Sequence, residues 1–215
     1  MMESLARSMP DFTLERQWVR RGAARIAGID EAGRGPWAGP VVAAAVCLPM
    51  EALPTELQSG LDDSKKLTRA RREALFDRLQ ACAEIGVGRA GVEEIDALNI
   101  LQASLLAMRR AVAALGAPPA AALVDGRQDP GLDCPVETVI KGDGRSLSIA
   151  AASIVAKVTR DREMAALALR HPGYGWERNQ GYGTAEHQRA LATLGPCAEH
   201  RRSFRPISQL VGSTL

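Results

Sequence analysis

The residues with the clearest chemistry in this sequence are four acidic side chains that follow hydrophobic runs. Asp30 and Glu31 end the run RIAGIDE, Asp125 ends AALVD, and Asp143 follows PVETVI in the loop KGDGR. These runs have the composition of β-strands, and neighbouring strands lie ~4.8 Å apart, so acids at the ends of three strands can converge on one point. Converging carboxylates repel one another, and oxygen ligands suit Mg²⁺ or Mn²⁺. The four acids therefore predict a site for divalent metal ions.

The adjacent pair Asp30 and Glu31 places a condition on this site. Successive residues of a strand point to opposite faces, so both carboxylates bind the same ions only if the chain bends after Asp30, and Ala32-Gly33 permits such a bend. No histidine lies near these acids in the sequence, which makes a metal-bound water the expected nucleophile. Two ions ~3.5 to 4 Å apart stabilise the attacking and leaving oxygens of a phosphodiester, so phosphodiester hydrolysis is the predicted chemistry.

A competing interpretation of the glycine-rich turn is a dinucleotide-binding site. Gly33, Gly35 and Ala38 fit the pattern GxGxxG/A after a strand. That pattern must open a helix, whereas Pro36 and Gly39-Pro40 interrupt one. The neighbouring acids would also repel a pyrophosphate, so we reject this interpretation.

Other chemically suggestive residues receive simpler explanations. Asp161 lies four residues after Lys157, which predicts an ion pair on a helix surface. His171, His187 and His200 lack metal-ligand spacing, and we expect them to be surface or loop residues. The four cysteines are far apart in the sequence without a CxxC pair, which predicts reduced, partly buried thiols.

Strands and helices alternate along the chain that must position these residues. Strands are expected over residues 25–30, 40–48, 84–91, 121–125 and 135–140. Helices are expected after Thr68, over 100–115, over 146–169 and after Thr184, and the Arg-rich tail is expected to form a small lid. This order favours a layered α/β fold in which antiparallel strands come first and parallel strands follow the first crossover.

Composition restricts the class of protein. The chain has 215 residues, of which 46% are hydrophobic and 24% charged, enough for one sizeable core. It contains no apolar run of the ~18 to 20 residues that span a bilayer, and no export signal, so a cytoplasmic protein is expected. The net charge is +2, but residues 157–205 carry nine basic and five acidic residues, a charge of +4. This asymmetry is compatible with a polyanionic partner.

The motifs together resemble a known family. GIDEAGRGPWAGP, LDDSKKL, LVDGR, IKGDGRSLSIAAASIVAKVTRD, HPGYGW, NQGYGT and HRRSF, in this order over residues 26–206, resemble ribonuclease HII, the type 2 ribonuclease H of bacteria. The resemblance implies an α/β, ribonuclease H-like mixed sheet flanked by helices, with a small helical C-terminal extension. Residues 1–170 would form the catalytic core, including an N-terminal helical segment over 1–24, and residues 171–215 would form the extension.

The resemblance also implies an activity. It is a metal-dependent endoribonuclease that cuts the RNA strand of RNA–DNA hybrids and cuts on the 5′ side of single ribonucleotides in duplex DNA, leaving 3′-hydroxyl and 5′-phosphate ends. Such an enzyme would initiate the removal of misincorporated ribonucleotides. The acids that match the family's metal ligands are Asp30, Glu31, Asp125 and Asp143, with two Mn²⁺ or Mg²⁺ ions expected during catalysis. A monomer is expected, and no protein partner is assigned.

Substrate-contacting residues are implied by the same resemblance. Gly33, Arg34 and Gly35 match a loop that reads the 2′-hydroxyl, and glycines let the backbone approach a minor groove closely. Tyr182 matches the tyrosine that packs against the sugar at the RNA–DNA junction. Three lysines match or neighbour phosphate-contacting segments: Lys65, Lys66 and Lys141. Three arginines of the tail are expected to add sequence-independent attraction to DNA: Arg201, Arg202 and Arg205.

Two positions depart from the family pattern, and two other functions stay open. Trp37 stands where leucine is frequent, and Gln180 replaces a frequent lysine, which removes a cation near the nucleic acid. The alternatives are a non-catalytic module that binds hybrids, and another nuclease of the same fold, such as a resolvase or a type 1 ribonuclease H. The four acids oppose the first alternative, because carboxylates near a phosphate backbone weaken binding unless a metal ion screens them.

Overall fold

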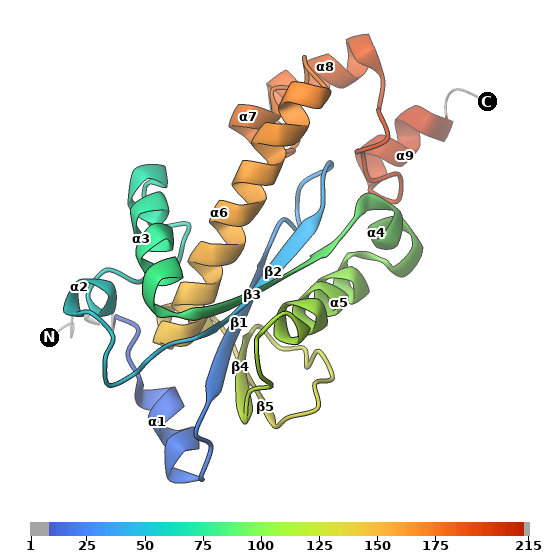
Figure 1. Cartoon of the computed structure of the whole chain (residues 1–215). Helices are drawn as coiled ribbons and strands as arrows, with labels where there is room; N and C mark the ends of the chain where they lie inside the picture. Colours follow the sequence, from blue (N-terminus) through green and yellow to red (C-terminus); the bar gives the residue numbers. More distant parts are fainter. Residues whose placement is uncertain (1–8, 213–215) are drawn as a thin grey trace, which may run out of the picture.

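Five strands form one mixed sheet in the order β3-β2-β1-β4-β5 (Figure 1). The computed structural model describes residues 9–212. The strands are β1 (Ile26–Ala32), β2 (Val41–Cys47), β3 (Glu84–Ala90), β4 (Ala121–Asp125) and β5 (Val136–Val139). The first three pair antiparallel, and β4 and β5 join β1 in parallel, as the sequence predicts.

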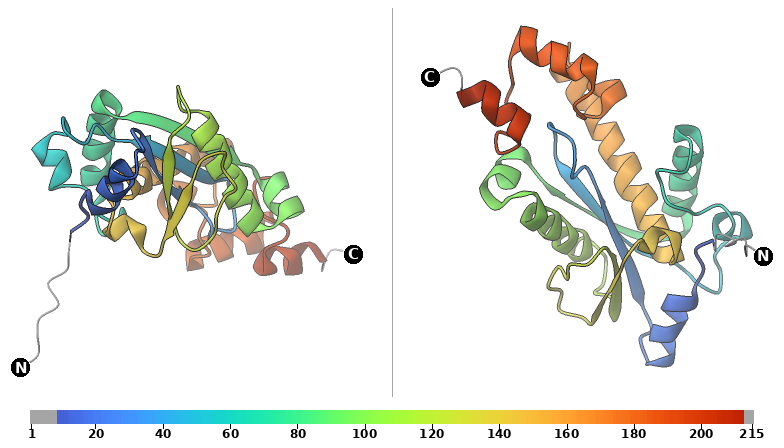
Figure 2. Two further views of the ribbon diagram at one scale, coloured as in Figure 1. Left: turned by 90° about the horizontal axis from the view of Figure 1, so that it is seen from below. Right: turned by 180° about the vertical axis from the view of Figure 1, so that it is seen from behind.

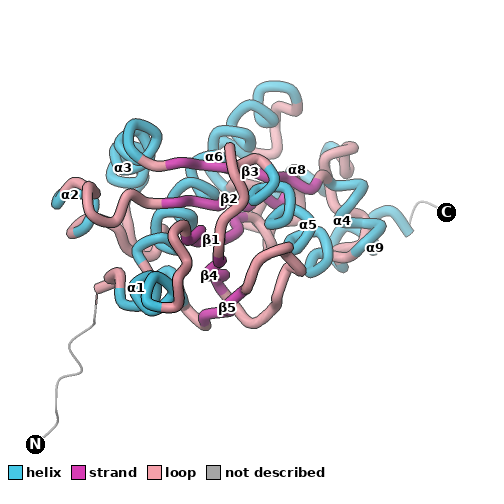
Figure 3. The backbone as a smooth tube through the Cα atoms, turned by 60° about the horizontal axis from the view of Figure 1, so that its bottom comes forward, coloured by secondary structure: helices cyan, strands magenta, loops and turns pink. Residues whose placement is uncertain are grey.

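Helices cover both faces of this sheet, and the tube in Figure 3 shows the strands between them. Before and between the strands the chain forms α1 (Thr13–Arg20), α2 (Thr55–Gln58), α3 (Arg69–Cys82), α4 (Val92–Leu98) and α5 (Ile100–Ala113). After β5 it forms the 3₁₀ turn Gly142–Gly144, then α6 (Leu147–Arg170), α7 (Trp176–Asn179), α8 (Ala185–Leu194) and α9 (Arg205–Gly212).

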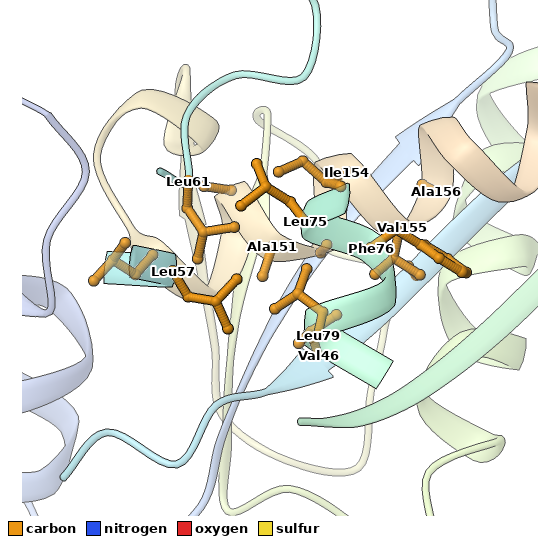
Figure 4. Packing of buried hydrophobic residues seen from close by; sticks show 14 of the residues in the cluster. Val46, Leu57, Leu61, Leu75, Phe76, Leu79, Ala151, Ile154, Val155 and Ala156 are labelled. Atoms are coloured by element: carbon orange, nitrogen blue, oxygen red, sulfur yellow. The ribbon is translucent and has the colours of Figure 1, made fainter. Parts of the chain in front are cut away.

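Strand alternation separates two cores. Ala43 and Ala45 of β2 pack with α5, whereas Ala44 and Val46 pack with α3 and α6 (Figure 4). On β1 the same alternation turns Gly28 toward α6, where a Cβ at this position would lie 2.0 Å from the backbone of the first turn of α6. Glycine at position 28 therefore allows β1 and α6 to approach closely, on the face of the sheet to which Asp30, two residues later, also points.

The residues after α6 pack around a third apolar cluster near the C-terminal end of that helix (Figure 2). It contains Tyr174, Trp176 and Leu191, together with Met164 and Leu167 of α6. The loop between β1 and β2 contacts this cluster, because Ala38 in that loop forms an isolated antiparallel β-bridge with His200. The C-terminal segment is thus joined to the loop that follows the Asp30-Glu31 pair.

Most predicted elements agree with the structure within one or two residues. Thr68 caps α3 by accepting a hydrogen bond from Arg71 N, and Thr184 caps α8. The fold class is confirmed, and residues 33–40 contain no helix, which agrees with our rejection of a dinucleotide site. The cysteines are free and partly buried as expected. No helix within residues 9–212 is long and apolar enough to cross a membrane.

Some expectations differ from the structure. Helices α2, α4, α7 and α9 were not predicted, since they are only four to eight residues long. The bend after Asp30 that Ala32-Gly33 was expected to permit lies at Gly33, whose φ is +98°, and β1 continues to pair with β2 through Ala32. Within the predicted N-terminal helical segment, α1 is present, and residues 1–8 lie outside the described residues.

Candidate active site

The parallel pairing of β1 with β4 brings two of the four acids to one edge of the sheet. Ile29 and Val124 form the last pair between β1 and β4, so the next residues, Asp30 and Asp125, lie side by side just beyond it. Asp143 follows β5 in the 3₁₀ turn, and the N–H of the adjacent Gly142 donates a 2.7 Å hydrogen bond to Asp125 Oδ1. This bond fixes the turn that carries Asp143 against the end of β4.

The carboxylates destabilise one another's ionised forms. Burial, followed by the charges of Glu31 and Asp125, raises the pKa of Asp30 well above its ordinary value, and a hydrogen bond from Ser153 acts in the opposite direction. Burial also raises the pKa of Glu31, against the opposing effect of Arg34. Burial together with the charges of Asp63 and Asp125 raises the pKa of Asp143 to about 6. The charge of Asp125 contributes to the raised pKa of all three groups, Asp30, Glu31 and Asp143.

The donor set is compatible with a hard cation. The group contains only carboxylate oxygens, and Glu31 Oε2 is a buried oxygen with no hydrogen-bond partner. The other oxygen of Glu31 accepts a 3.1 Å hydrogen bond from Arg34. Within residues 9–212, no three His, Cys, Asp or Glu side chains stand close enough around one point to hold an ion in their present arrangement.

A cavity of about 440 Å³ joins the first two acids to the predicted recognition residues. Its lining includes seven residues singled out from the sequence: Asp30, Glu31, Gly33, Arg34, Gly35, Lys65 and Tyr182. A Cβ built on Gly35 would lie 3.4 Å from the Tyr182 ring, which places this tyrosine against the loop. The Tyr182 side chain is 47% exposed, so its ring remains accessible across the cavity.

The predicted lysines occupy different surroundings. Lys65 lines the cavity, and its charge opposes the rise in the pKa of Asp143. Lys66 Nζ contacts Asp62 at 2.8 Å. Lys141 is exposed with a left-handed backbone at φ 54° and is absent from the cavity lining. Asp161 pairs with Lys157 at 2.7 Å, which confirms the predicted ion pair.

Two predictions about the C-terminal segment are wrong. Arg201 was expected to attract DNA, but its side chain is fully buried, and only Arg202 and Arg205 remain exposed. His187 and His200 were expected to be surface or loop residues; His187 instead lies in α8 and is 0% exposed, and His200 lies between α8 and α9 but is only 1% exposed. The sequence gives no local sign of this burial, since it depends on packing between α7, α8 and the loop before β2.

The two buried histidines form a hydrogen-bonded chain to the backbone of Tyr182. The N–H of Cys197 donates to His200 Nδ1 at 3.0 Å, so His200 carries its proton on Nε2. That Nε2–H donates to His187 Nε2 at 3.0 Å, and His187 Nδ1–H donates to the Tyr182 carbonyl at 3.0 Å. Trp176 Nε1–H also donates to His187 Nε2 at 3.2 Å. Because His187 Nε2 and His200 Nδ1 both accept hydrogen bonds, this chain requires both rings to be neutral.

Several further residues line the same cavity and were not predicted: Ser64, Arg72, Ser153, Lys157 and Arg160. Three of them, Ser153, Lys157 and Arg160, lie four and three residues apart along α6, so they share one face of the helix. Polar residues with this spacing inside a helix whose other positions are mostly apolar are the signal that could have identified them. Ser64 and Arg72 are brought in by the segment before α3.

Comparisons with known proteins identify the family of this chain. The family model described as Ribonuclease HII matches residues 27–207. Ribonuclease HII of Ruegeria pomeroyi is 59% identical over 210 residues, covering 97% of this chain and 88% of that protein. The crystal structure of ribonuclease H2 from Pyrococcus horikoshii OT3 is similar at a TM-score of 0.73 and 27% identity, over 88% of this chain and 98% of that one.

A more distant structure shares the fold. Bst-RNase HIII in complex with Mn²⁺ has a TM-score of 0.67 and 19% identity, and the match covers 89% of this chain and 70% of that one. The family model and the curated relative both extend over most of the chain, including Asp30, Asp125, Asp143 and Tyr182. The chain belongs to the ribonuclease HII family and is a ribonuclease H endonuclease.

Proposed function

We propose that this ribonuclease H cuts duplex DNA on the 5′ side of a single embedded ribonucleotide, as well as the RNA strand of hybrids, and leaves 3′-hydroxyl and 5′-phosphate ends. The observation that carries this proposal is the single cavity shared by Asp30, Glu31, the loop Gly33–Gly35 and Tyr182. A groove that holds acids at one side and close-approach glycines at the other is suited to test the sugar next to the phosphate that is cut.

Divalent ions, Mn²⁺ or Mg²⁺, would be held by Asp30, Glu31, Asp125 and Asp143. The buried, unpartnered Glu31 Oε2 and the raised pKa of Asp30 support this assignment, because a cation would offset the repulsion among these groups. When bound, such ions activate water and stabilise the oxygens of the phosphodiester that is cut. The carboxylates of the chain hold the ions, and Asp125 connects the two halves of the ligand set through its contact with Gly142 N.

The remaining cavity residues orient the nucleic acid. Lys65 lies beside the acids and can contact a backbone phosphate as a point charge. Tyr182, whose ring lies next to Gly35, is exposed and can pack against a sugar. Lys66, Lys141, Arg202 and Arg205 add weaker, salt-dependent attraction to the duplex. The protein would thereby initiate removal of misincorporated ribonucleotides from DNA.

The test is a labelled DNA duplex with one central ribonucleotide, incubated with the protein and Mg²⁺ or Mn²⁺, with the cut mapped to the nucleotide. We expect one cut on the 5′ side of the ribonucleotide, none in the matched all-DNA duplex, and none with a chelator. Binding without scission would indicate a hybrid-binding module. Scission only within runs of several ribonucleotides would indicate type 1 specificity, and scission of four-way junctions a resolvase; any of these three outcomes contradicts the proposal.

A further inference from the structure

Two arginines are buried next to the loop after β1 without an acidic partner. Arg201 is 0% exposed and Arg160 is 1% exposed. Neither guanidinium forms an ion pair with any described carboxylate within 4 Å. An unpaired buried cation is costly, so the groups that compensate it are informative about its role.

All hydrogen-bond acceptors of Arg201 are backbone carbonyls of the same loop. Its Nη2 donates to Gly33 O at 2.6 Å and to Pro40 O at 3.2 Å, its Nη1 donates to Arg34 O at 3.0 Å, and its Nε donates to Gly39 O at 2.9 Å. One rigid guanidinium fork therefore joins the two ends of the loop. Burial, together with the charge of Arg160, lowers the pKa of Arg201 to about 9, which leaves it charged near neutral pH.

Arg160 uses the same chemistry on different carbonyls. Its Nε donates to Pro40 O at 3.0 Å, its Nη1 to Gln180 O at 3.1 Å and its Nη2 to Ala38 O at 3.2 Å. It has no hydrogen bond to the carbonyls of Gly33 or Arg34. The two arginines share the carbonyl of Pro40, and only Arg201 holds the carbonyls of the predicted reader segment, Gly33 and Arg34.

The geometry of the peptide bond links the hydrogen bonds of Arg201 to substrate recognition. A trans peptide is planar, and its C=O and N–H point in opposite directions. When Arg201 holds the carbonyls of Gly33 and Arg34 inward, the N–H groups of Arg34 and Gly35 point to the opposite side. Gly33, at φ +98°, supplies the backbone conformation that this orientation needs.

The N–H groups of Arg34 and Gly35 point to the side of the loop that faces the cavity. Arg34 and Gly35 line the cavity, whereas Arg201 does not. Neither of the two N–H groups has an acceptor among the described residues, so both are available to an external ligand. The 2′-hydroxyl of a ribonucleotide offers an oxygen acceptor, which the corresponding carbon of DNA lacks.

We propose that Arg201 is a positioning residue for substrate recognition, which fixes two peptide units so that the N–H groups of Arg34 and Gly35 are presented together to the 2′-hydroxyl. This inference rests on the proposed function, since it names the groups that would distinguish ribose from deoxyribose in the same cavity. Arg201 acts only through the loop and does not touch the substrate.

The test compares Arg201→Lys with Leu191→Ala, a change at a buried residue of the C-terminal cluster that lies outside the cavity lining. For each protein, KM is measured on the duplex with one ribonucleotide, and the inhibition constant Ki is measured for the all-DNA duplex as a competitor. We expect Arg201→Lys to lower the ratio Ki/KM about tenfold, because one lysine cannot hold both carbonyls and a hydrogen bond to the substrate is lost. Leu191→Ala removes buried packing of the C-terminal cluster without touching the cavity lining; we expect it to lower the melting temperature with a change in Ki/KM of less than about threefold.

Several results would overturn the inference. One is an unchanged Ki/KM ratio in a folded Arg201→Lys protein, and another is an equal fall in both variants. If Arg201→Lys does not fold, amide exchange in the unmodified protein decides the matter: Arg34 and Gly35 amides must be protected by the single-ribonucleotide duplex much more than by the all-DNA duplex. Absence of any cut at a single ribonucleotide by the unmodified protein refutes the proposed function itself and removes the inference with it.

Discussion

Asparagine at position 143 is expected to abolish cleavage and yet stabilise the metal-free protein. The carboxylate of Asp143 lies close to Asp63 and Asp125, and burial and these charges raise its pKa from 3.8 to about 6. Between these pH values the folded protein binds more protons than the unfolded chain, so the stability of the unmodified protein falls as the pH rises. Asp143→Asn carries no charge and does not lose this stability.

The size of the effect follows from the same pKa. A rise from 3.8 to about 6 corresponds to about 3 kcal/mol once both states are ionised. Asp143 is partly exposed, and solvent screening reduces the expected gain to about 2 kcal/mol. For a chain of this length that gain raises the melting temperature by about 4 to 8 °C. The asparagine amide also keeps a donor for Asp63.

The assay is thermal unfolding followed by circular dichroism in the presence of a chelator, at pH values of about 8 and about 4. We expect Asp143→Asn to melt higher than the unmodified protein at the higher pH and equally at the lower pH, while its cleavage with Mg²⁺ is lost. Asp133→Asn makes the same chemical change at an exposed loop position and should change neither property. A lower melting temperature for Asp143→Asn at pH 8 would refute the reasoning about repulsion.

Three other outcomes are expected. Asp30→Asn and Asp125→Asn should each eliminate cleavage while retaining a cooperative melt, because an amide removes repulsion along with a ligand; measurable turnover with metal would remove the residue from the ligand set. Gly28→Ala should destabilise the protein by more than about 3 kcal/mol in denaturant unfolding, since its Cβ would lie 2.0 Å from the backbone of Ser148; a soluble variant with unchanged midpoint would contradict this packing. Burial lowers the pKa of His200 from 6.5 to about 4, so its contribution is present above pH 6.5 and is lost as the pH falls toward 4, about 3 kcal/mol in total. His200→Gln should flatten that pH dependence, and identical slopes for the two proteins would exclude it.

The sequence predicts the sheet because its strands are continuous apolar runs bounded by glycine and proline. The run 40–48 is buried on both faces, which explains why β2 lies in the interior of the sheet. Short helices cannot be predicted in this way, because they are too short to show a repeating apolar pattern. Helix α4 has seven residues with Ile95 as its one buried side chain, so it carries no repeating apolar pattern.

The candidate site is predictable where a residue acts from its own strand end. Asp30 lies two residues before the end of β1, Asp125 ends the adjacent β4, and the resemblance to ribonuclease HII identifies the same positions. Arg201 and His187 are different. The acceptors of the Arg201 side chain lie 161 to 168 residues away in the sequence, and His187 depends on His200, 13 residues later, as well as on Tyr182. A charged or polar residue in a tail has the same local pattern whether it is solvated or buried, and only the tertiary packing decides between the two.

Helix α6 connects the two parts of the cavity, the acids and the recognition loop. It is one continuous helix of 24 residues, about 36 Å long, and it carries Ser153 next to the acids and Arg160 next to the recognition loop. A single residue inserted between these two positions would rotate one relative to the other by ~100°. A change of length between Ser153 and Arg160 is therefore expected to abolish activity, because it would turn one part of the cavity away from the other.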